Sequence, residues 1–319
     1  MSPAAARFSG QRILVTGASG FIGSHLCGRL RGCGAELHCV SREARRQSEA
    51  GLRWWCADLA DTAAVREIVS AIQPDRVFHL ASEVAGARGL ELVIPTLRSN
   101  LLSTVNLLTA VAERSCSSFV LAGSMEEPEA TDAVALPCSP YAAAKWASAG
   151  YARMFHALYG LPAVVLRIFM VYGPGQMDIR KLIPYVTLSL LRGEAPKLTS
   201  GGRPVDWIFV EDVVDGLIAA GTAENLGGAT LDIGTGALVT VREIAEMLAR
   251  IVNPSIAPIF GAIEDRPLET VRAADTTATE KMVGWKSRTS LSEGLEKTVA
   301  WYRQGYSRPG PSTFANSQI

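Results

Sequence analysis

Tyr141 and Lys145 are the two residues of this chain that could most directly carry out acid–base chemistry together. They stand four positions apart in Ser139-Pro140-Tyr141-Ala142-Ala143-Ala144-Lys145, and this spacing places both side chains on one face of a helix. A free tyrosine has a pKa of about 10, but a neighbouring ammonium favours its phenolate. Tyr141 is therefore predicted to take a proton from a substrate hydroxyl. Ser139 is predicted to cap the helix and Pro140 to occupy its first turn.

Two further polar residues stand shortly before this pair. Ser124 follows the apolar run 118–122 and is predicted to hold the same substrate oxygen in an oxyanion-hole role. Glu126 could abstract a proton next to a ketone. Because Glu127 and Glu129 follow at once, Glu126 could equally be a solvent-facing acid.

A glycine cluster lies near the start of the chain, between an apolar run and a helical pattern. Gly17 allows a tight turn, Gly20 allows the backbone to approach a pyrophosphate, and Gly23 allows close packing of the helix on a sheet. The amino terminus of that helix would present N–H groups and a partial positive charge to the phosphates. The predicted cofactor contacts here are Gly17, Ser19, Gly20, Phe21, Ile22 and Gly23. The alternative is an ordinary glycine-rich turn, but together with Tyr141 and Lys145 the cluster indicates hydride transfer with a nicotinamide ring.

The end of the second predicted strand bears on the choice of cofactor. An acidic residue there would bind the ribose 2′-hydroxyl of NAD, whereas this chain reads Val40-Ser41-Arg42. Ser41 could donate to a 2′-phosphate and Arg42 could neutralise it, which favours NADP over NAD. Alternatively, Arg42 belongs with Arg45 and Arg46 to a solvated loop. Asp58, beside Leu59, could meet the adenine or simply lie on the surface.

Short apolar runs alternate with helical patterns through the first half of the chain. Strands are predicted at 12–15, 36–40, 76–80, 118–122 and 163–168, and helices at 21–31, 62–72, 97–114 and 141–159. Continuous apolar strands that alternate with helices indicate a parallel sheet covered on both faces. The expected fold is therefore α/β, a Rossmann-type doubly wound parallel sheet with a small C-terminal α/β substrate lobe.

The regular alternation of strands and helices ends after residue 169, where prolines and glycines divide the chain into short segments. We expect a dinucleotide-binding domain at 1–169 with a returning segment at about 205–225. Residues 170–204 and 226–304 would form the substrate-binding lobe. The tail at 305–319 is rich in Ser, Pro, Gly and Asn and is predicted to be flexible.

Composition limits the classes of partner and location. Lys plus Arg and Asp plus Glu both number 31, so charge gives no reason to expect nucleic acid or an anionic membrane as a partner. The six cysteines form no Cys-x-x-Cys pair, and the four histidines lack metal-ligand spacing. We therefore expect reduced thiols in a cytoplasmic protein, and no metal site. No apolar stretch approaches the roughly 20 residues that span a bilayer. Residues 1–7 have no long apolar segment before a cleavage site, so we do not expect secretion.

Residues 11–303 resemble the extended short-chain dehydrogenase/reductase family of nucleotide-sugar epimerases and dehydratases. The matching pieces are Thr16 to Ser24, Phe78-His79-Leu80-Ala81, Asn100, Ser124, Tyr141/Lys145, Tyr172 to Gly175, Phe209 to Val213, and Arg266-Pro267. The resemblance implies a cofactor beside Leu80, Ala81, Ser82, Asn100, Tyr141 and Lys145, and a substrate diphosphate held by Arg266. It also implies a homodimer formed through the helices that match 97–114 and 141–159.

The chain departs from the family pattern at the predicted substrate pocket. Met170 stands where the family often has Asn, and Val205-Asp206-Trp207 replaces Arg-Asp-Phe, with Arg203 as the nearby cation. The expected substrate contacts are therefore Met170, Arg203 and Arg266. The spacing of Ser124-Met125-Glu126 is similar to the Thr-x-Glu of sugar 4,6-dehydratases and uronic-acid decarboxylases.

The leading hypothesis is an NAD(P)-dependent nucleotide-sugar epimerase or dehydratase. It would oxidise sugar C4 to a 4-keto intermediate, with Tyr141 as base and Glu126 as the candidate second acid or base. One alternative is an NADPH-dependent ketoreductase of a keto-sugar or related small molecule. An alternative of another class is a catalytically silent dinucleotide-sensing module, against which the intact Ser124, Tyr141 and Lys145 argue.

Overall fold

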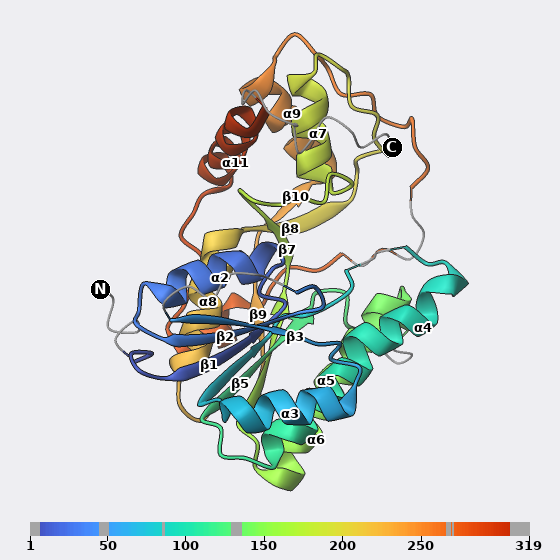
Figure 1. Cartoon of the computed structure of the whole chain (residues 1–319). Helices are drawn as coiled ribbons and strands as arrows, with labels where there is room; N and C mark the ends of the chain where they lie inside the picture. The colour runs from blue at the N-terminus through green and yellow to red at the C-terminus, as the bar shows by residue number, and fades with distance from the viewer. Residues whose placement is uncertain are drawn as a thin grey trace. The chain divides into compact units, whose positions relative to one another are not determined.

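The computed structural model describes residues 7–44, 51–84, 87–128, 136–265, 269 and 271–306, and these form two compact units (Figure 1). The first unit takes its described residues from Met1–Phe169, Val213–Ile233 and Asp275–Lys286. The second takes them from Met170–Asp212, Gly234–Ala274 and Ser287–Ile319. Outside the described residues lie Arg45, Arg46, Glu129, Arg266 and nearly all of the predicted tail.

The first unit is built on a seven-stranded sheet in the order β3-β2-β1-β4-β5-β6-β9. All of its neighbouring strands pair in parallel. The strands are β1 (Arg12–Thr16), β2 (Glu36–Ser41), β3 (Leu52–Cys56), β4 (Arg76–His79), β5 (Ser118–Ser124), β6 (Ala163–Ile168) and β9 (Thr230–Ile233). The predicted doubly wound parallel sheet is thereby confirmed. The strand order reverses between β1 and β4, and in such sheets ligands bind beyond the carboxyl ends of the strands at this reversal.

Helices cover both faces of this sheet (Figure 1). On one face lie α2 (Phe21–Arg31) and the part of α8 (Val210–Thr222) that belongs to this unit, while α10 (Thr276–Val283) contacts β9. On the other face lie α3 (Thr62–Ile72), α5 (Ser103–Ala112) and α6 (Pro140–Tyr159). Their apolar faces bury a continuous core against β1, β4, β5 and β6. Each such aliphatic side chain contributes roughly 1.5–3 kcal/mol of transfer free energy, so this packing fixes where the strand ends lie.

Local capping sets the ends of the two helices that matter most for the site. The Asp61 side chain accepts hydrogen bonds from the N–H groups of Ala63 and Ala64 at the start of α3. Ser139 caps α6 by accepting the Ala142 N–H, as predicted, and Gly160 ends α6 in the left-handed conformation with φ +70°. The α6 register, and hence the direction of Tyr141, is thus set at both ends.

The long helix predicted at 97–114 begins earlier and is not uniform. A short 3-10 turn (Leu90–Leu92) and α4 (Val93–Thr96) lead into a π-helical segment, η2 (Leu97–Leu102), which continues into α5. Asn100 lies within η2 and is buried. Single π-helical turns occur often at functional sites, because they redirect a side chain relative to a regular helix.

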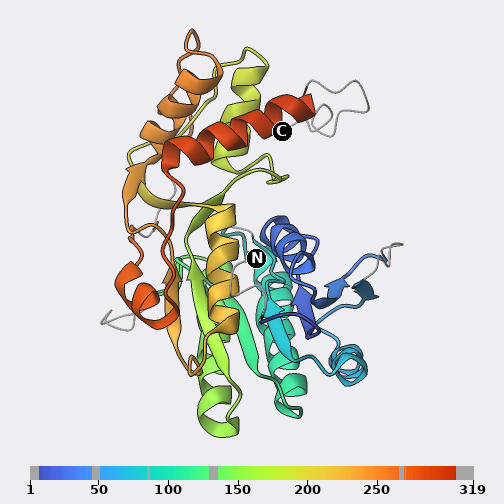
Figure 2. The ribbon, with the colours of Figure 1, turned by 90° about the vertical axis from the view of Figure 1, so that its left-hand side faces the viewer.

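The second unit holds a three-stranded sheet in the order β10-β8-β7. Its strands are β7 (Met170–Tyr172), β8 (Pro204–Phe209) and β10 (Leu238–Thr240), packed with α7 (Leu182–Leu191), α9 (Val241–Val252) and α11 (Leu291–Tyr306) (Figure 2). Because β8 pairs with β7 and β10, the chain rejoins the first unit at Val213 and not at the expected 205. It also stays there through β9 and returns again with α10. Tyr172 and Trp207 are buried in the core of this unit.

Candidate active site

The glycine turn after β1 is shaped by close backbone contacts. Gly17 has φ +68°, and a Cβ there would lie 2.6 Å from the Ala81 nitrogen and 2.8 Å from the Leu80 oxygen. A Cβ on Gly23 would overlap the Gly17 carbonyl. Gly20 stands at the amino terminus of α2 with no side-chain cap. The turn therefore leaves the start of α2 open to an anionic ligand, which fits a pyrophosphate.

The loop after β4 lies directly against this turn and carries an unsatisfied hydroxyl. Asn100 holds the loop, because its amide accepts the Glu83 N–H at 2.7 Å and donates to the Glu83 carbonyl at 3.0 Å. The buried Ser82 hydroxyl oxygen has no hydrogen-bond partner among the described residues. A buried polar atom without a partner costs free energy unless a ligand or water satisfies it. Ser82 therefore fits a role in binding the dinucleotide, whereas Asn100 acts on the loop.

The buried His79 connects β1, which precedes the glycine turn, with the helix that follows the loop after β4. The His79 ring lies between the Thr16 hydroxyl at 2.6 Å and the Thr104 hydroxyl at 2.9 Å. The Thr16 hydroxyl also accepts the Ala81 N–H at 3.2 Å. Burial lowers the pKa of His79 to about 3, and the charge of Lys145 contributes to this shift. His79 is therefore a neutral, structural residue at physiological pH.

Of the residues predicted to contact the adenosine end, Arg42 and Asp58 are exposed and Ser41 is half-buried. Ser41 ends β2 and accepts the Glu43 N–H, and the Arg42 guanidinium lies 3.9 Å from the Glu83 carboxylate with its side chain 74% exposed. Asp58 accepts the Ala60 N–H and lies 3.9 Å from Arg98. Leu59 is buried and holds Asn106 through its carbonyl. Ser41, Arg42 and Asp58 are thus open to a ligand, while Leu59 is a packing residue.

Ser124, Tyr141 and Lys145 come together where β5 ends and α6 begins. The Ser124 hydroxyl accepts the Glu126 N–H at 3.2 Å, and Ser124 lies close enough to Tyr141 to lower the pKa of its phenol. The Lys145 ammonium lies 5.9 Å from the centre of the Tyr141 ring and donates to the Ala122 carbonyl at 2.7 Å. The structure thus brings together three of the four predicted catalytic side chains.

The pKa values of this group describe the protein without the positive charge of an oxidised nicotinamide. Burial raises the pKa of Tyr141, and the hydrogen bond from Ser124 only partly offsets this, so the phenol is protonated in the protein alone. Burial also lowers the pKa of Lys145 to about 8, with Glu127 acting in the opposite direction. The ammonium is therefore mostly protonated near neutral pH, but it does not by itself produce a phenolate at Tyr141.

Glu126 occupies a different position from the other three. Its carboxylate accepts a hydrogen bond from the Ser139 hydroxyl at 3.4 Å and lies 3.8 Å from the Cys138 sulfur. It is half-buried, so it is not the fully solvated acid of the alternative interpretation. Its negative charge also raises the pKa of Tyr141, which places it within electrostatic reach of the phenol.

Glu127 is the functional candidate that the sequence analysis missed. It was grouped with Glu129 as a sign of a solvent-facing run, yet its side chain is only 4% exposed. Its carboxylate accepts the Ser124 N–H at 2.7 Å. Burial raises the pKa of Glu127 to about 7, opposed by the Ser124 N–H and by the charges of Lys145, Arg167 and Arg153. Only the apolar character of neighbouring Met125 and Pro128 hinted that this turn is buried.

Met170 and Arg203, the two predicted substrate contacts that the structure describes, belong to the second unit. Met170 begins β7 and is half-buried, and Arg203 forms an ion pair with Glu269 at 3.0 Å. Asp206, from the segment that departs from the family pattern, is fully buried and accepts the N–H groups of Thr235, Gly236 and Ala274. The Asp206 carboxylate therefore holds two loop segments of the second unit in place.

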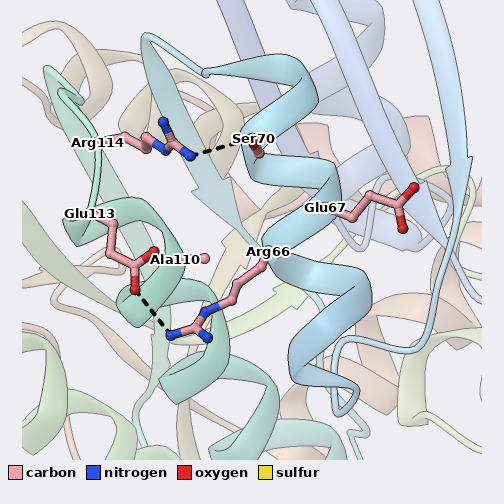
Figure 3. Close-up of a pocket in the computed structure, with 6 residues that line it drawn as sticks. All are labelled: Arg66, Glu67, Ser70, Ala110, Glu113 and Arg114. Carbon is pink, nitrogen blue, oxygen red and sulfur yellow. Dashed lines mark hydrogen bonds and ion pairs between the residues drawn. The ribbon is translucent and has the colours of Figure 1, made fainter.

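The first unit has a hollow between α3 and the end of α5 (Figure 3). Charged side chains of α3 and of the two residues after α5 line it, with an ion pair between Arg66 and Glu113 at 3.1 Å and a hydrogen bond from Arg114 to Ser70. None of the predicted site residues lines this hollow. Among the described residues, no group of His, Cys, Asp and Glu could hold a metal ion, and no helix is long and apolar enough to cross a bilayer.

Comparison with known proteins gives a consistent result. A model of the NAD dependent epimerase/dehydratase family matches residues 13–234. The UDP-glucose 4-epimerase of Mycolicibacterium smegmatis is 30% identical over 311 residues, which cover 92% of this chain and 98% of that protein. The dTDP-glucose 4,6-dehydratase of Streptomyces griseus is 31% identical over 314 residues, covering 92% and 94%.

A solved structure agrees with these relatives. MoeE5 in complex with UDP-glucose and NAD is 32% identical, with a TM-score of 0.81, and the match covers 93% of this chain and 100% of MoeE5. The turn after β1 and the Tyr141–Lys145 pair lie within residues 13–234, which the family model matches. The chain therefore belongs to the NAD dependent epimerase/dehydratase family and is an enzyme of the extended short-chain dehydrogenase/reductase type.

Proposed function

We propose that this enzyme epimerises or dehydrates a nucleotide sugar through oxidation at sugar C4. The observation that carries the proposal is the meeting of Ser124, Tyr141 and Lys145 at the carboxyl end of β5. A secondary alcohol whose hydroxyl met Ser124 and Tyr141 would lose its proton to the tyrosine oxygen. The bound dinucleotide would supply the hydride acceptor, a positive charge beside Tyr141, and later the hydride donor.

Each protein group has one task in this scheme. Tyr141 accepts and returns the proton of the C4 hydroxyl. Ser124 donates a hydrogen bond to the oxygen that changes between alcohol and ketone. Lys145 supplies positive charge that stabilises the phenolate once it forms.

Glu126 is the residue that would separate a dehydratase from an epimerase. A carboxylate near a 4-keto sugar could remove the proton next to the ketone, which then permits elimination of a neighbouring hydroxyl. The hydrogen bond from Ser139 orients the Glu126 carboxylate near the start of α6. Support for this role also comes from the dTDP-glucose 4,6-dehydratases among the relatives.

The cofactor is a nicotinamide dinucleotide, and we propose NADP as the preferred form. The end of β2 offers the Ser41 hydroxyl and the exposed Arg42 guanidinium, with no carboxylate in the position that binds a ribose 2′-hydroxyl. Glu83 opposes this preference, because its carboxylate lies 3.9 Å from Arg42. The same Ser41–Arg42 pair favours a second candidate function, a ketoreductase that consumes NADPH.

A homodimer is also proposed. Exposed apolar side chains occur on or beside α4 and on α6, and these two helices contact each other. The exposed residues are Leu90 at 86%, Ile94 at 63%, Leu97 at 44%, Tyr151 at 41% and Trp146 at 37%. Exposed apolar groups on neighbouring helices are typical of protein interfaces. Sedimentation equilibrium measures the mass, and a monomer at micromolar concentration would contradict this proposal.

The function is tested by identifying the retained dinucleotide and the sugar that reacts. We expect heat-denatured protein to release an oxidised cofactor, and expect UDP-glucose or dTDP-glucose to raise the melting temperature by mass action. The product is then identified by NMR, as a C4 epimer or a 4-keto-6-deoxy sugar. Loss of cofactor during purification, with turnover only on added NADPH, would favour the ketoreductase. Binding of dinucleotide with no turnover of any substrate would favour a silent sensing module.

A further inference from the structure

Glu127 forms a closed turn beneath the catalytic serine. Its backbone N–H donates to the Ser124 carbonyl at 3.1 Å, and its carboxylate accepts the Ser124 N–H at 2.7 Å. Both main-chain groups of Ser124 are therefore bound by one residue. Any change in the Glu127 side chain would be transmitted to Ser124, whose hydroxyl contacts Tyr141.

The sheet leaves a space for this carboxylate at Gly123. A Cβ at position 123 would lie 2.5 Å from the Glu127 Oε1 atom and 2.9 Å from a Val165 methyl group. Because any larger residue would occupy the same volume, glycine at 123 and glutamate at 127 are sterically linked. The carboxylate fills the place of a side chain on β5.

Charged groups approach Glu127 from two neighbouring elements. Lys145 and Arg153 act on it from α6, and Arg167 acts from β6. Arg167 is itself paired with the buried Asp232 of β9 at 2.6 Å. Glu127 and Glu126 both act on Tyr141, because each carboxylate raises its pKa. The negative charge of Glu127 thus lies among Lys145, Arg153 and Arg167, with Tyr141 also within electrostatic reach.

We propose that Glu127 is a positioning residue of this site: its carboxylate fixes Ser124 against Tyr141 and stabilises the Lys145 ammonium. Glu127 touches neither substrate nor cofactor in this role. The part that concerns turnover rests on the proposed function above, whereas the effect on Lys145 is a property of the protein alone. The two are therefore tested separately.

The first test measures Lys145 directly, without cofactor or substrate. The chain has six lysines, at 145, 181, 197, 281, 286 and 297, so a protein labelled with ¹³C at the lysine ε-carbon gives few NMR signals. Lys145→Arg identifies the signal of interest. The pKa of Lys145 is held near 8 with the help of Glu127. We expect Glu127→Gln to lower this titration midpoint by about one pH unit. The same substitution at Glu67, which is exposed on α3, should leave it unchanged.

The second test uses the pH dependence of kcat/KM on the sugar found to react. The neutral glutamine removes a negative charge that raises the pKa of both Tyr141 and Lys145. Both limbs of the bell-shaped profile should therefore move to lower pH in Glu127→Gln. Glu127→Ala also removes the acceptor for the Ser124 N–H, and its kcat should fall by up to roughly 100-fold, with KM little changed, since misplacement of the catalytic group affects the chemical step.

The outcomes distinguish this inference from the proposed function. An unshifted Lys145 midpoint in folded Glu127→Gln would overturn the inference, whatever the enzyme catalyses. If that variant does not fold, Gly123→Ala takes its place, because the added methyl group displaces the same carboxylate and should lower the midpoint in the same direction. An unshifted midpoint there would also overturn it. A shifted midpoint with no turnover of any nucleotide sugar would instead contradict the proposed function and leave the role of Glu127 standing.

Discussion

The turn after β1 and the turn after β5 lie at the carboxyl edge of the same sheet, yet they achieve their shapes in opposite ways. The first turn excludes side chains, since a Cβ at Gly17 or Gly23 would overlap the backbone. The second is filled with polar side chains, and Glu127 occupies the space left by Gly123. A site that binds phosphates needs exposed N–H groups, whereas a site that moves protons needs groups with altered pKa values. The two turns therefore respond differently to substitution.

The largest expected effect comes from removing the reactive atom of the second turn. Tyr141→Phe should lower turnover by roughly 10²- to 10⁴-fold, the usual contribution of a general base. Dinucleotide retention should be unchanged, because the turn after β1 is untouched. Steady-state kinetics and the amount of cofactor released on denaturation measure the two quantities. Tyr159→Phe, at an exposed position at the end of the same helix, is the matched control and should behave as wild type. Near-normal turnover of Tyr141→Phe would remove this residue from the mechanism.

The reverse pattern is expected when the first turn is altered. Gly23→Ala places a methyl group against the Gly17 carbonyl, and the resulting strain should lower the free energy of unfolding by about 1–3 kcal/mol. Retained dinucleotide should fall sharply, because Gly17 and the start of α2 must separate. Gly28→Ala is the matched control in the same helix, since a Cβ there meets nothing within 4 Å. The control should be unchanged or more stable by up to about 1 kcal/mol. Full cofactor retention in Gly23→Ala would show that the turn tolerates the added volume.

The difference between the two turns also explains what the sequence could predict. The glycine turn is visible in the sequence because its shape depends on missing side chains at fixed spacing. The ends of α3 and α6 are also visible, since Asp61, Ser139 and Gly160 act on residues only a few positions away. The alternation of apolar strands with helices was likewise enough to predict the parallel sheet, and the four-residue spacing was enough to predict the pairing of Tyr141 with Lys145.

The environment of Glu127 could not be predicted in this way. Its burial depends on the pairing of Gly123 with Arg167 across β5 and β6, and on α6 closing over the strand. Those partners are distant in sequence, so Glu127 resembled its exposed acidic neighbours. The strand order of the second unit could not be predicted for the same reason, because β8 pairs with β7 and β10, which are distant in the sequence. The raised pKa of Tyr141 likewise results from burial, which cannot be predicted from the four-residue spacing of Tyr141 and Lys145.

The smallest expected effect is on the pH dependence of the unfolding free energy. It comes from two buried titratable groups, His79 beneath the turn after β1 and Glu127 beneath the turn after β5. The pKa of His79 falls from 6.5 to about 3, so the unfolded chain binds more protons than the folded one between these values. Its contribution to stability is complete above pH 6.5 and falls as the pH falls.

The pKa of Glu127 rises from 4.5 to about 7, so the folded chain binds more protons between these values. Its contribution is complete below pH 4.5 and falls as the pH rises. Each group alone would give a slope of about 1.4 kcal/mol per pH unit.

These opposite slopes should nearly cancel between pH 4.5 and 6.5, where both groups act. Urea unfolding at intervals across this range measures the cancellation. Relative to wild type, Glu127→Gln should gain unfolding free energy as the pH rises, because only the His79 slope remains. His79→Gln, which can still bond Thr16 and Thr104, should lose unfolding free energy over the same range. Glu67→Gln, which changes an exposed carboxylate, should run parallel to wild type. If the difference curves for the first two variants had the same sign, one of the two buried groups would be in the opposite protonation state from the one derived from its surroundings.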